Sequence, residues 1–211
     1  MKKYGEEYHS IVHQNLIKNK GYYLFRAKYA NDIYWKHLKG KVLEFGSGLG
    51  QNILLHKETS LGIDIEDFSI NFCKNKGIKV VKDIKKIKSN SFDSILVSHC
   101  LEHLENPAQF LKEFYRVLKP SGRLLLLLPT WSKNKPVKNF ESNVSQHLYS
   151  WNFYEINELL KLEGFKIKIN KFNYAYGFSV FYKLNFNLAL FLIKLFGRLN
   201  NRKEMLLLAE K

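Results

Sequence analysis

The chain has 211 residues, of which 45% are hydrophobic and 25% charged, a composition that excludes a disordered or fibrous protein. Its two cysteines exclude a disulfide scaffold and favour a reducing compartment. The first ten residues lack the apolar run of a secretory signal, so a cytoplasmic location is expected. The net charge of +15 favours anionic partners such as acidic substrates, nucleic acids or acidic membranes, although a lysine-rich proteome would explain it as well.

Short apolar segments alternate with amphipathic ones from residue 41 onward, which is typical of a parallel sheet covered on both faces. Strands are predicted at residues 41–45, 61–65, 78–81, 92–97, 123–128, 165–170 and 204–210. Helices are predicted at residues 49–57, 67–76, 107–118 and 152–163, and within residues 1–39. Residues 131–146 are basic and lack strand character, so a loop is expected there. This order of elements predicts a doubly wound α/β fold.

A glycine loop separates the first predicted strand of this sheet from the helix expected after it. Gly46, Gly48 and Gly50 stand in the sequence VLEFGSGLG, and such a loop lets the backbone approach a ligand closely. Gln51 occupies the place of the third glycine in the dinucleotide-binding pattern G-x-G-x-x-G, and no Gly-Lys-Ser/Thr follows. The loop therefore argues against a pyrophosphate or triphosphate ligand.

Two carboxylates follow the next two predicted strands. Asp64 ends the second strand, where a carboxylate can accept hydrogen bonds from both hydroxyl groups of a ribose. Asp83 follows the third strand, where a carboxylate can accept a hydrogen bond from an exocyclic amine. Together with the glycine loop, these acids indicate an adenosine that carries a small zwitterion in place of phosphates.

Five motifs in order give residues 40–130 a resemblance to a known family. The segments VLEFGSGLG, GIDI, VVKDI, FDSILVSHCLEHL and FYRVLKPSGRLLLLLP resemble those of class I S-adenosylmethionine-dependent methyltransferases. The resemblance implies a Rossmann-like, mostly parallel seven-stranded sheet with an antiparallel final strand, N-terminal helices and an apolar insert before the last strand. It also implies a single methyltransferase domain over residues 1–211, with a helical cap (1–39), a cofactor-binding core (40–130) and a substrate-side, C-terminal part (131–211).

The resemblance further implies how S-adenosylmethionine would be held. The glycine loop would contact the methionine part of this cofactor and Glu44 would help to position its amine. Asp64 would bind the ribose hydroxyls, and Asp83 would bind the adenine. The implied cofactor contacts are Glu44, Gly46, Ser47, Gly48, Gly50, Asp64, Ile65, Asp83, Ile84 and Ser98.

A cluster of histidines follows the fourth predicted strand, at the place where the family's methyl group points. The segment His99-Cys-Leu-Glu102-His103 and the later His147 are similar to the E-x-x-E-H and late histidine of ubiquinone O-methyltransferases and small-RNA 2′-O-methyltransferases, which bind a divalent ion. Three hypotheses stay open: a divalent metal site made of all four residues, acid–base catalysis by the three histidines without metal, and a structural or binding role. The remaining histidines carry no pattern and are expected on the surface or in packing contacts; they are His9, His13, His37 and His56.

The two ends of the chain are rich in aromatic and basic residues, which suits a sugar, a nucleotide or a quinone as acceptor. The segment HLYSW…ELLKLEGFKI resembles methyltransferases encoded in bacterial surface-polysaccharide gene clusters. The favoured function is therefore O-methylation of a sugar or another small molecule in surface-polysaccharide biosynthesis. The first alternative is methylation of a quinone or lipid precursor at the membrane surface. The second is RNA methylation, against which the sequence lacks the Asn-Pro aromatic motif of base-amine methylases. The third is a non-enzymatic cofactor-binding subunit.

Residues 178–199 are strongly apolar and lie close to several basic side chains. Three hypotheses fit this segment: a buried cover helix, a contact with a second copy, and an interfacial helix on an anionic membrane. The last would place the protein peripherally on the inner face of the membrane. No stretch reaches about 18 apolar residues, so a spanning helix is not expected.

Overall fold

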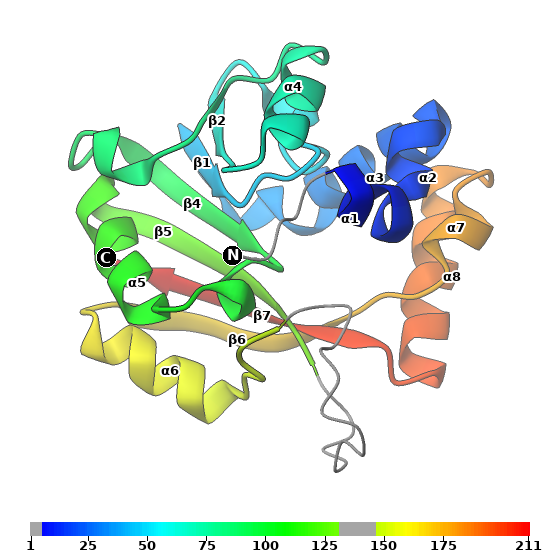
Figure 1. The fold of residues 1–211 in the computed structure, drawn as a ribbon. Coiled ribbons are helices and arrows are strands. Elements are labelled where there is room, and N and C mark those ends of the chain that lie inside the picture. The colour runs from blue at the N-terminus through cyan, green and yellow to red at the C-terminus, as the bar shows by residue number, and fades with distance from the viewer. Residues whose placement is uncertain (1–5, 131–146) are drawn as a thin grey trace, which may run out of the picture.

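The computed structural model describes residues 6–130 and 147–211, and its centre is a seven-stranded sheet (Figure 1). The strands are β1 (Val42–Phe45), β2 (Ser60–Ile63), β3 (Val80–Val81), β4 (Phe92–Ser98), β5 (Leu118–Pro129), β6 (Lys166–Tyr174) and β7 (Lys203–Glu210). Their order in the sheet is β3-β2-β1-β4-β5-β7-β6, and β7 runs antiparallel to both of its neighbours while β1 to β5 are parallel. This topology confirms the predicted fold class.

Helices surround the sheet on both faces. They are α1 (Glu6–Val12), α2 (Gln14–Lys18), α3 (Lys20–Ile33), α4 (Asp67–Lys74), α5 (Pro107–Val117), α6 (Phe153–Leu162), α7 (Phe178–Phe181) and α8 (Phe186–Leu199). Local sequence signals set where they begin. The Asn106 side chain accepts a hydrogen bond from the N–H of Gln109 to cap α5, and a reciprocal capping box joins Asn152 and Glu155 at α6.

Each face of the sheet has its own hydrophobic core. Helices α5 and α6 pack on one face, where Leu111 and Ile156 are fully buried. Helices α3 and α8 pack on the other face, where Ala30 and Ile193 are fully buried. Because successive side chains of a strand point to opposite faces, β5 contributes alternate leucines to the two cores. The continuous apolar run in residues 124–128 follows from this double burial.

The helix expected over residues 49–57 does not form. The chain instead makes tight turns that end in the short 3₁₀ segment η2 (Leu54–His56). Gly50 has a φ of 73°, which an α-helix does not allow, and the hydrogen bonds from Ile53 to Gly50 and from His56 to Ile53 span three residues instead of four. The N–H groups near the loop therefore belong to turns and not to a regular helix.

The strands at the far edge are longer than the sequence predicts. Strand β5 begins at Leu118, which pairs with Phe92 of β4, and β7 joins β5 only from Arg123 onward. Strand β6 extends to Tyr174 because β7 pairs with it antiparallel as far as that residue. The loop expected at 131–146 lies outside the described residues.

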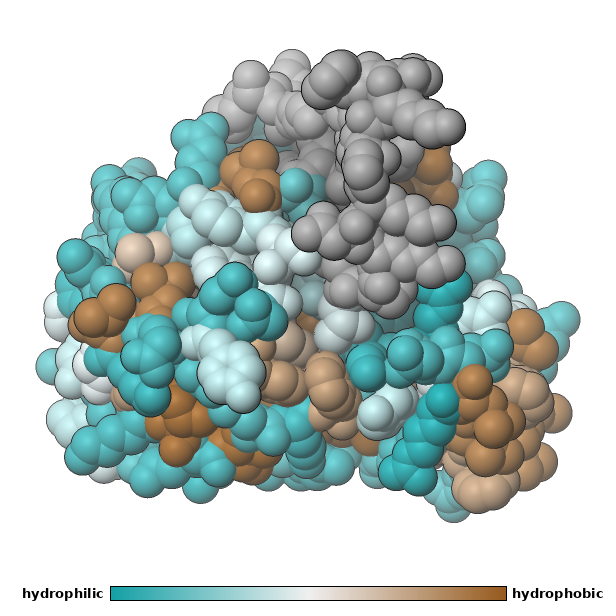
Figure 2. Space-filling model, turned by 90° about the horizontal axis from the view of Figure 1, so that it is seen from below, coloured by the Kyte–Doolittle hydropathy of each residue, from teal (hydrophilic) through white to brown (hydrophobic). Residues whose placement is uncertain are grey.

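The apolar segment 178–199 forms α7 and α8. Helix α8 covers the body of the protein with one side, on which Ala189, Ile193 and Gly197 are buried. The opposite side exposes hydrophobic residues, and seen from below they gather at the side of the molecule where α8 lies (Figure 2). Across residues 6–130 and 147–211, no helix combines the length and apolarity needed to cross a membrane.

Candidate functional site

The glycine loop follows β1 at the carboxyl edge of the parallel strands. Gly46, Gly48 and Gly50 have φ angles of 72°, 50° and 73°, in the left-handed region that favours glycine. The N–H groups of Gly46 and Ser47 both donate to the carbonyl of Ile63 in β2, at 2.9 Å. The loop is thus fixed against the neighbouring strand, with no side chain at three of its positions to keep a ligand away from the backbone.

Asp64 lies directly after β2 and is oriented by this loop. Its Oδ2 accepts a hydrogen bond from the N–H of Gly48 at 2.8 Å, and its Oδ1 accepts one from the N–H of Glu66 at 3.0 Å. Burial raises the pKa of the Asp64 carboxyl, and these backbone hydrogen bonds offset part of the rise. A carboxylate oxygen can accept more than one hydrogen bond, so Asp64 retains acceptor capacity that fits the two hydroxyls of a ribose.

Glu44 in β1 is a buried carboxyl group, and only one of its two oxygens has a hydrogen-bond partner among the described residues. The residue is 1% exposed. Asn52 donates to its Oε1 at 2.7 Å, whereas Oε2 has no hydrogen-bond partner among the described residues. Burial raises the pKa of Glu44 to about 8, an effect that the Asn52 hydrogen bond reduces and the charge of Asp64 increases. An unpaired buried oxygen of this kind fits an ammonium group, because a nearby cation favours the ionised carboxylate.

The other expected cofactor contacts follow β2, β3 and β4. Ile65 is 55% exposed beside Asp64, as a residue that covers a flat ligand would be. Asp83 caps the short segment η3 (Ile84–Lys86), and its Oδ1 accepts a hydrogen bond from the N–H of Lys85 at 2.9 Å. Ile84 is buried, and Ser98 ends β4 half-buried. The structure therefore brings the loop and Asp64 into contact, whereas the Asp83 side chain caps the neighbouring segment η3.

His99 forms an ion pair that the sequence did not reveal. It has a φ of 50°, and its Nε2 lies 2.7 Å from Oε2 of Glu204 in β7. Tyr34 and Asn173 donate to the other oxygen of Glu204, at 3.2 Å and 2.7 Å. Burial opposes ionisation of both partners, but their mutual hydrogen bond outweighs it, so the pKa of His99 is raised and the pKa of Glu204 is lowered. The contact with Glu204 therefore favours the charged form of the imidazole.

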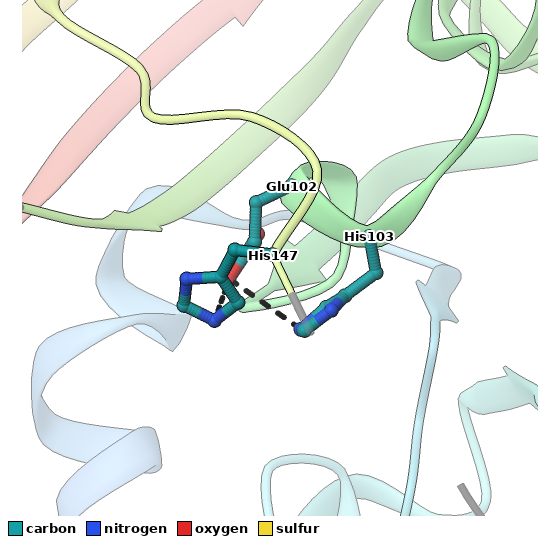
Figure 3. Close-up of side chains that lie close together, drawn as sticks. All are labelled: Glu102, His103 and His147. Atoms are coloured by element: carbon teal, nitrogen blue, oxygen red, sulfur yellow. Dashed lines mark ion pairs between the residues drawn. The ribbon is translucent and has the colours of Figure 1, made fainter. Parts of the chain in front are cut away.

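Glu102, His103 and His147 converge next to this pair (Figure 3). One ligand atom from each lies within 4.8 Å of the others. Oε1 of Glu102 lies 3.9 Å from Nε2 of His103, 3.9 Å from Nε2 of His147 and 3.8 Å from Nδ1 of His99. Three of the four expected metal ligands thus form one group, whereas Nε2 of His99 is engaged by Glu204. Two imidazoles and a carboxylate are donors that suit a borderline divalent metal.

The backbone of η4 (Leu101–His103) fixes the position of His147. The N–H groups of Leu148 and Tyr149 donate to the carbonyl of Glu102 at 2.8 Å and 3.2 Å. Glu102 is fully buried, and neither of its carboxyl oxygens has a hydrogen-bond partner among residues 6–130 and 147–211. Burial raises the pKa of Glu102, and burial together with the charge of His99 lowers the pKa of His147. His147 is therefore a neutral imidazole at physiological pH, able to accept a proton.

Helix α1 contributes residues that the sequence did not place at the site. Burial, and then the charge of Glu102, raises the pKa of Tyr8, so this phenol stands near the cluster. Nδ1 of His9 lies 2.9 Å from Nδ1 of His13, and Nε2 of His9 lies 3.0 Å from the hydroxyl of Ser69. These contacts tie α1 to α4 above the glycine loop. No local sequence pattern predicts the contact between His9 and Ser69, because these residues are sixty positions apart in the chain.

A cavity of about 700 Å³ opens beside His99. In strand order it lies on the β5, β7 and β6 side of β4, whereas Asp64 and the glycine loop lie on the β2 and β1 side. Its aromatic lining consists of Tyr29, Tyr34, Trp151, Phe153, Phe172, Tyr176 and Phe178. The sequence predicted aromatic residues from both ends of the chain on the acceptor side, and the residues it indicated include Tyr29, Tyr34, Trp151, Tyr176 and Phe178 of this lining, but not Phe153 or Phe172.

Comparison with known proteins decides the family. Residues 43–126 match a family described as a methyltransferase domain. These residues form a class I S-adenosylmethionine-dependent methyltransferase domain. The methyltransferase uses S-adenosylmethionine as its methyl donor, and the glycine loop, Asp64 and the unpaired oxygen of Glu44 fit the parts of that molecule.

Relatives of the methyltransferase span different lengths. A protein of unassigned function from Methanocaldococcus jannaschii is 28% identical over 173 residues, which cover 78% of this chain and 80% of that protein. A probable S-adenosylmethionine-dependent methyltransferase of Mycolicibacterium smegmatis is 28% identical over 60% of this chain and 52% of its own length. The ubiquinone/menaquinone biosynthesis C-methyltransferase UbiE of Vibrio cholerae is 24% identical over 69% of this chain and 64% of its own length. The chain thus spans about half to two thirds of the length of these last two relatives.

Solved structures share the fold of the methyltransferase. A methyltransferase from Archaeoglobus fulgidus superposes with a TM-score of 0.64 at 20% identity, covering 95% of this chain and 99% of that one. At this level of identity the likeness concerns the fold, and the acceptor has to be inferred from the site itself.

Proposed function

We propose that this methyltransferase transfers a methyl group to a hydroxyl of a small molecule, with a sugar hydroxyl in surface-polysaccharide biosynthesis as the favoured acceptor. The observation that carries the proposal is the group of Glu102, His103 and His147, which is linked to an aromatic-lined cavity through His99, a cavity residue whose Nδ1 lies 3.8 Å from Oε1 of Glu102. An alcohol is a poor nucleophile until its proton is removed, and this group supplies a base at that place. Aromatic walls also suit the apolar face of a sugar ring.

On the donor side, the residues of this chain bind and orient. When bound, S-adenosylmethionine supplies a methyl group that is already activated for displacement. Asp64 accepts hydrogen bonds from the ribose hydroxyls, and Oε2 of Glu44 faces the ammonium group. The other proposed contacts are Gly46, Ser47, Gly48, Gly50, Ile65, Asp83, Ile84 and Ser98. Much of the rate enhancement then comes from holding donor and acceptor in line.

On the acceptor side, His147 takes the proton of the hydroxyl. Its lowered pKa keeps the ring neutral, and the nearby Glu102 favours the imidazolium that forms. His103 lies at the same distance from Glu102 and is the second candidate base. A divalent ion held by these three side chains is the competing hypothesis for the same group, in which the ion would lower the pKa of the acceptor hydroxyl.

A labelled-methyl transfer assay tests the proposal. Cell-extract fractions from a bacterium that makes a surface polysaccharide are incubated with S-adenosylmethionine carrying a labelled methyl group, and products are separated by size and charge. We expect label in a small molecule, and its loss by at least about 100-fold in His147→Ala. His56→Ala is the matched control, because His56 stacks on Trp35 away from the cluster. Label found only in RNA would refute the small-molecule proposal, and full activity with no divalent metal by elemental analysis would dismiss the metal hypothesis.

A second candidate acceptor is a quinone or lipid precursor reached at the inner face of the cytoplasmic membrane. It is supported by α8, whose outer side exposes Leu188, Phe191, Leu195 and Leu199, at 49%, 61%, 38% and 71%. Lys194 and Arg198 flank this stripe, and residues 164–203 contain no aspartate or glutamate. An apolar stripe with basic flanks suits an anionic bilayer surface. Relatives named for ubiquinone and menaquinone biosynthesis point the same way.

Vesicle flotation tests this second candidate. We expect the intact protein to float with vesicles that contain phosphatidylglycerol and not with vesicles of phosphatidylcholine alone. Phe191→Ser should lose most of this binding. Leu162→Ser is the control, because Leu162 is 80% exposed on α6 and stands outside the α8 stripe. Equal loss in both variants, or no flotation of the wild type, would rule out membrane contact through α8.

A further inference from the structure

We propose that the acceptor carries an anionic group, a carboxylate or a phosphate, which is bound by Arg26 inside the aromatic-lined cavity. This inference deepens the proposed function and rests on it, since it takes that cavity to be the acceptor site. It concerns the chemical class of the acceptor, which neither the family nor its relatives define for this chain.

Arg26 is a guanidinium without an acidic partner. It projects from α3 into the cavity, and no carboxylate of the described residues lies within 4.0 Å of it. Its contacts are a long hydrogen bond of 3.4 Å from Nη1 to the hydroxyl of Tyr22 and the ring of Phe178, 4.3 Å from its central carbon. Its Nε is buried and has no hydrogen-bond partner there. The residue is half-buried, and a cation that is partly removed from water is normally paired, because its desolvation is costly.

The other charges of the cavity have the same sign. Arg202 and Lys203 also line it, and neither has a carboxylate within 4.0 Å in the described part of the chain. Their contacts are with aromatic rings: Lys203 lies 4.3 Å from the centre of the Phe172 ring. Glu204 is the acid among the lining residues, and its charge is already balanced by His99 at 2.7 Å. The cavity is therefore cationic overall and favours an anion over a neutral molecule or a cation.

The donor geometry of Arg26 suits an oxyanion. A guanidinium presents N–H donors in a fork that matches carboxylate and phosphate oxygens. The paired Arg116 illustrates the contrast, since it donates to Glu113 at 2.7 Å and to the carbonyl of Ile87 at 2.7 Å. Arg116 is a structural arginine with its donors filled, whereas Arg26 keeps donors free beside a cavity large enough for a sugar or an aromatic acid.

Matched pairs of ligands test the inference by binding. The intact protein, saturated with S-adenosylhomocysteine, is titrated by calorimetry or ligand-observed NMR. The pairs are glucuronate against glucose, benzoate against benzamide, and glucose phosphate against methyl glucoside. We expect the anionic member of at least one pair to bind about tenfold or more tightly than its neutral partner. The first two pairs report on carboxylates and the third on phosphates, so the outcome also separates these two groups.

The variant Arg26→Met should abolish that preference while affinity for S-adenosylhomocysteine stays unchanged. Arg26→Lys should retain part of it, because the charge remains and the fork is lost. Equal binding of the anionic and neutral members of every pair, the absence of binding included, would overturn the inference. So would a preference that survives in Arg26→Met.

Thermal unfolding distinguishes a binding role from a structural one. Arg26→Met keeps most of the packing and removes an unpaired charge, so we expect its unfolding midpoint not to fall. Arg116→Met removes a paired arginine and should lower the midpoint by several degrees. A comparable fall in both variants would mean that Arg26 is structural. Because these readouts do not require turnover, they remain separate from the labelled-methyl assay, whose failure would reject the proposed function instead.

Discussion

Glu44 offers the sharpest test of the electrostatics at the donor side. Burial raises the pKa of this carboxyl from 4.5 to about 8, so the folded protein holds a proton that the unfolded chain releases above pH 4.5. Each pKa unit corresponds to about 1.4 kcal/mol. The free energy of unfolding should therefore fall by up to about 5 kcal/mol, through Glu44 alone, as the pH rises from 4.5 to 8.

The variant Glu44→Gln isolates this contribution. Glutamine has nearly the same shape, can still accept the hydrogen bond that Asn52 donates to Oε1 at 2.7 Å, and does not ionise. We expect variant and wild type to have similar stability near pH 5, where both side chains are neutral. Near pH 8.5 to 9, above the folded-state pKa, the variant should be the more stable by several kcal/mol. Other titrating groups are common to both proteins and cancel in the comparison, apart from the neighbouring Asp64.

Urea denaturation followed by circular dichroism at a series of pH values measures the difference, with equal m-values as the check that both proteins unfold in the same way. A difference in stability that does not change between pH 5 and 9 would refute the reasoning about burial. A variant that becomes less stable at high pH would show that the carboxylate of Glu44 has a favourable partner.

Three further outcomes are expected. Asp64→Asn should weaken binding of S-adenosylhomocysteine by at least about tenfold, measured by calorimetry, because it replaces a charged acceptor of hydroxyl protons; unchanged affinity would contradict the ribose assignment. Glu204→Gln should move the NMR titration of His99 to lower pH, since the charge that raises the pKa of this imidazole is removed, and an unmoved titration would exclude that cause. Gly46→Ala should lower the free energy of unfolding by about 1–3 kcal/mol or more, because its φ is 72° and a Cβ would overlap a neighbouring side chain. The control Gly21→Ala, in helix α3 where a Cβ meets nothing closer than 3.4 Å, should change stability by less than about 1 kcal/mol.

The sequence predicted the sheet and its chemistry where the signals are local. Apolar runs bounded by Gly46 and by Pro129 gave the strands, and Asn106 followed by Pro107 gave the start of α5. Asp64 and the loop could be paired before the structure was known, because consecutive parallel strands end at the same edge of a sheet. The hydrogen bond from Gly48 to Asp64 shows that the two lie together, while their contacts with the cofactor stay a prediction.

Local sequence signals wrongly predicted a helix directly after the glycine loop. Residues 49–57 have helix-compatible side chains, but the left-handed φ of Gly50 and the turns that follow it prevent a regular helix. The same sequence also gave no hint of Asn52, whose amide is the hydrogen-bond partner of Glu44.

The charges of the site were decided by segments far apart in the chain. His99 and Glu204 are separated by 105 residues, and they meet because β7 inserts between β5 and β6 in antiparallel orientation. That contact takes His99 out of the expected ligand set and leaves Glu102, His103 and His147 as a group. It also neutralises the acid of the cavity, which leaves Arg26 unbalanced.

The sequence by itself determined the family, the donor and the residue types at the edge of the sheet, since these depend on short motifs that keep their meaning in isolation. Only the tertiary structure decided which charges are paired and which are left free. Pairing depends on distances of a few ångströms between distant segments, and the cost of a buried charge depends on how much water remains around it, neither of which is encoded in spacing along the chain.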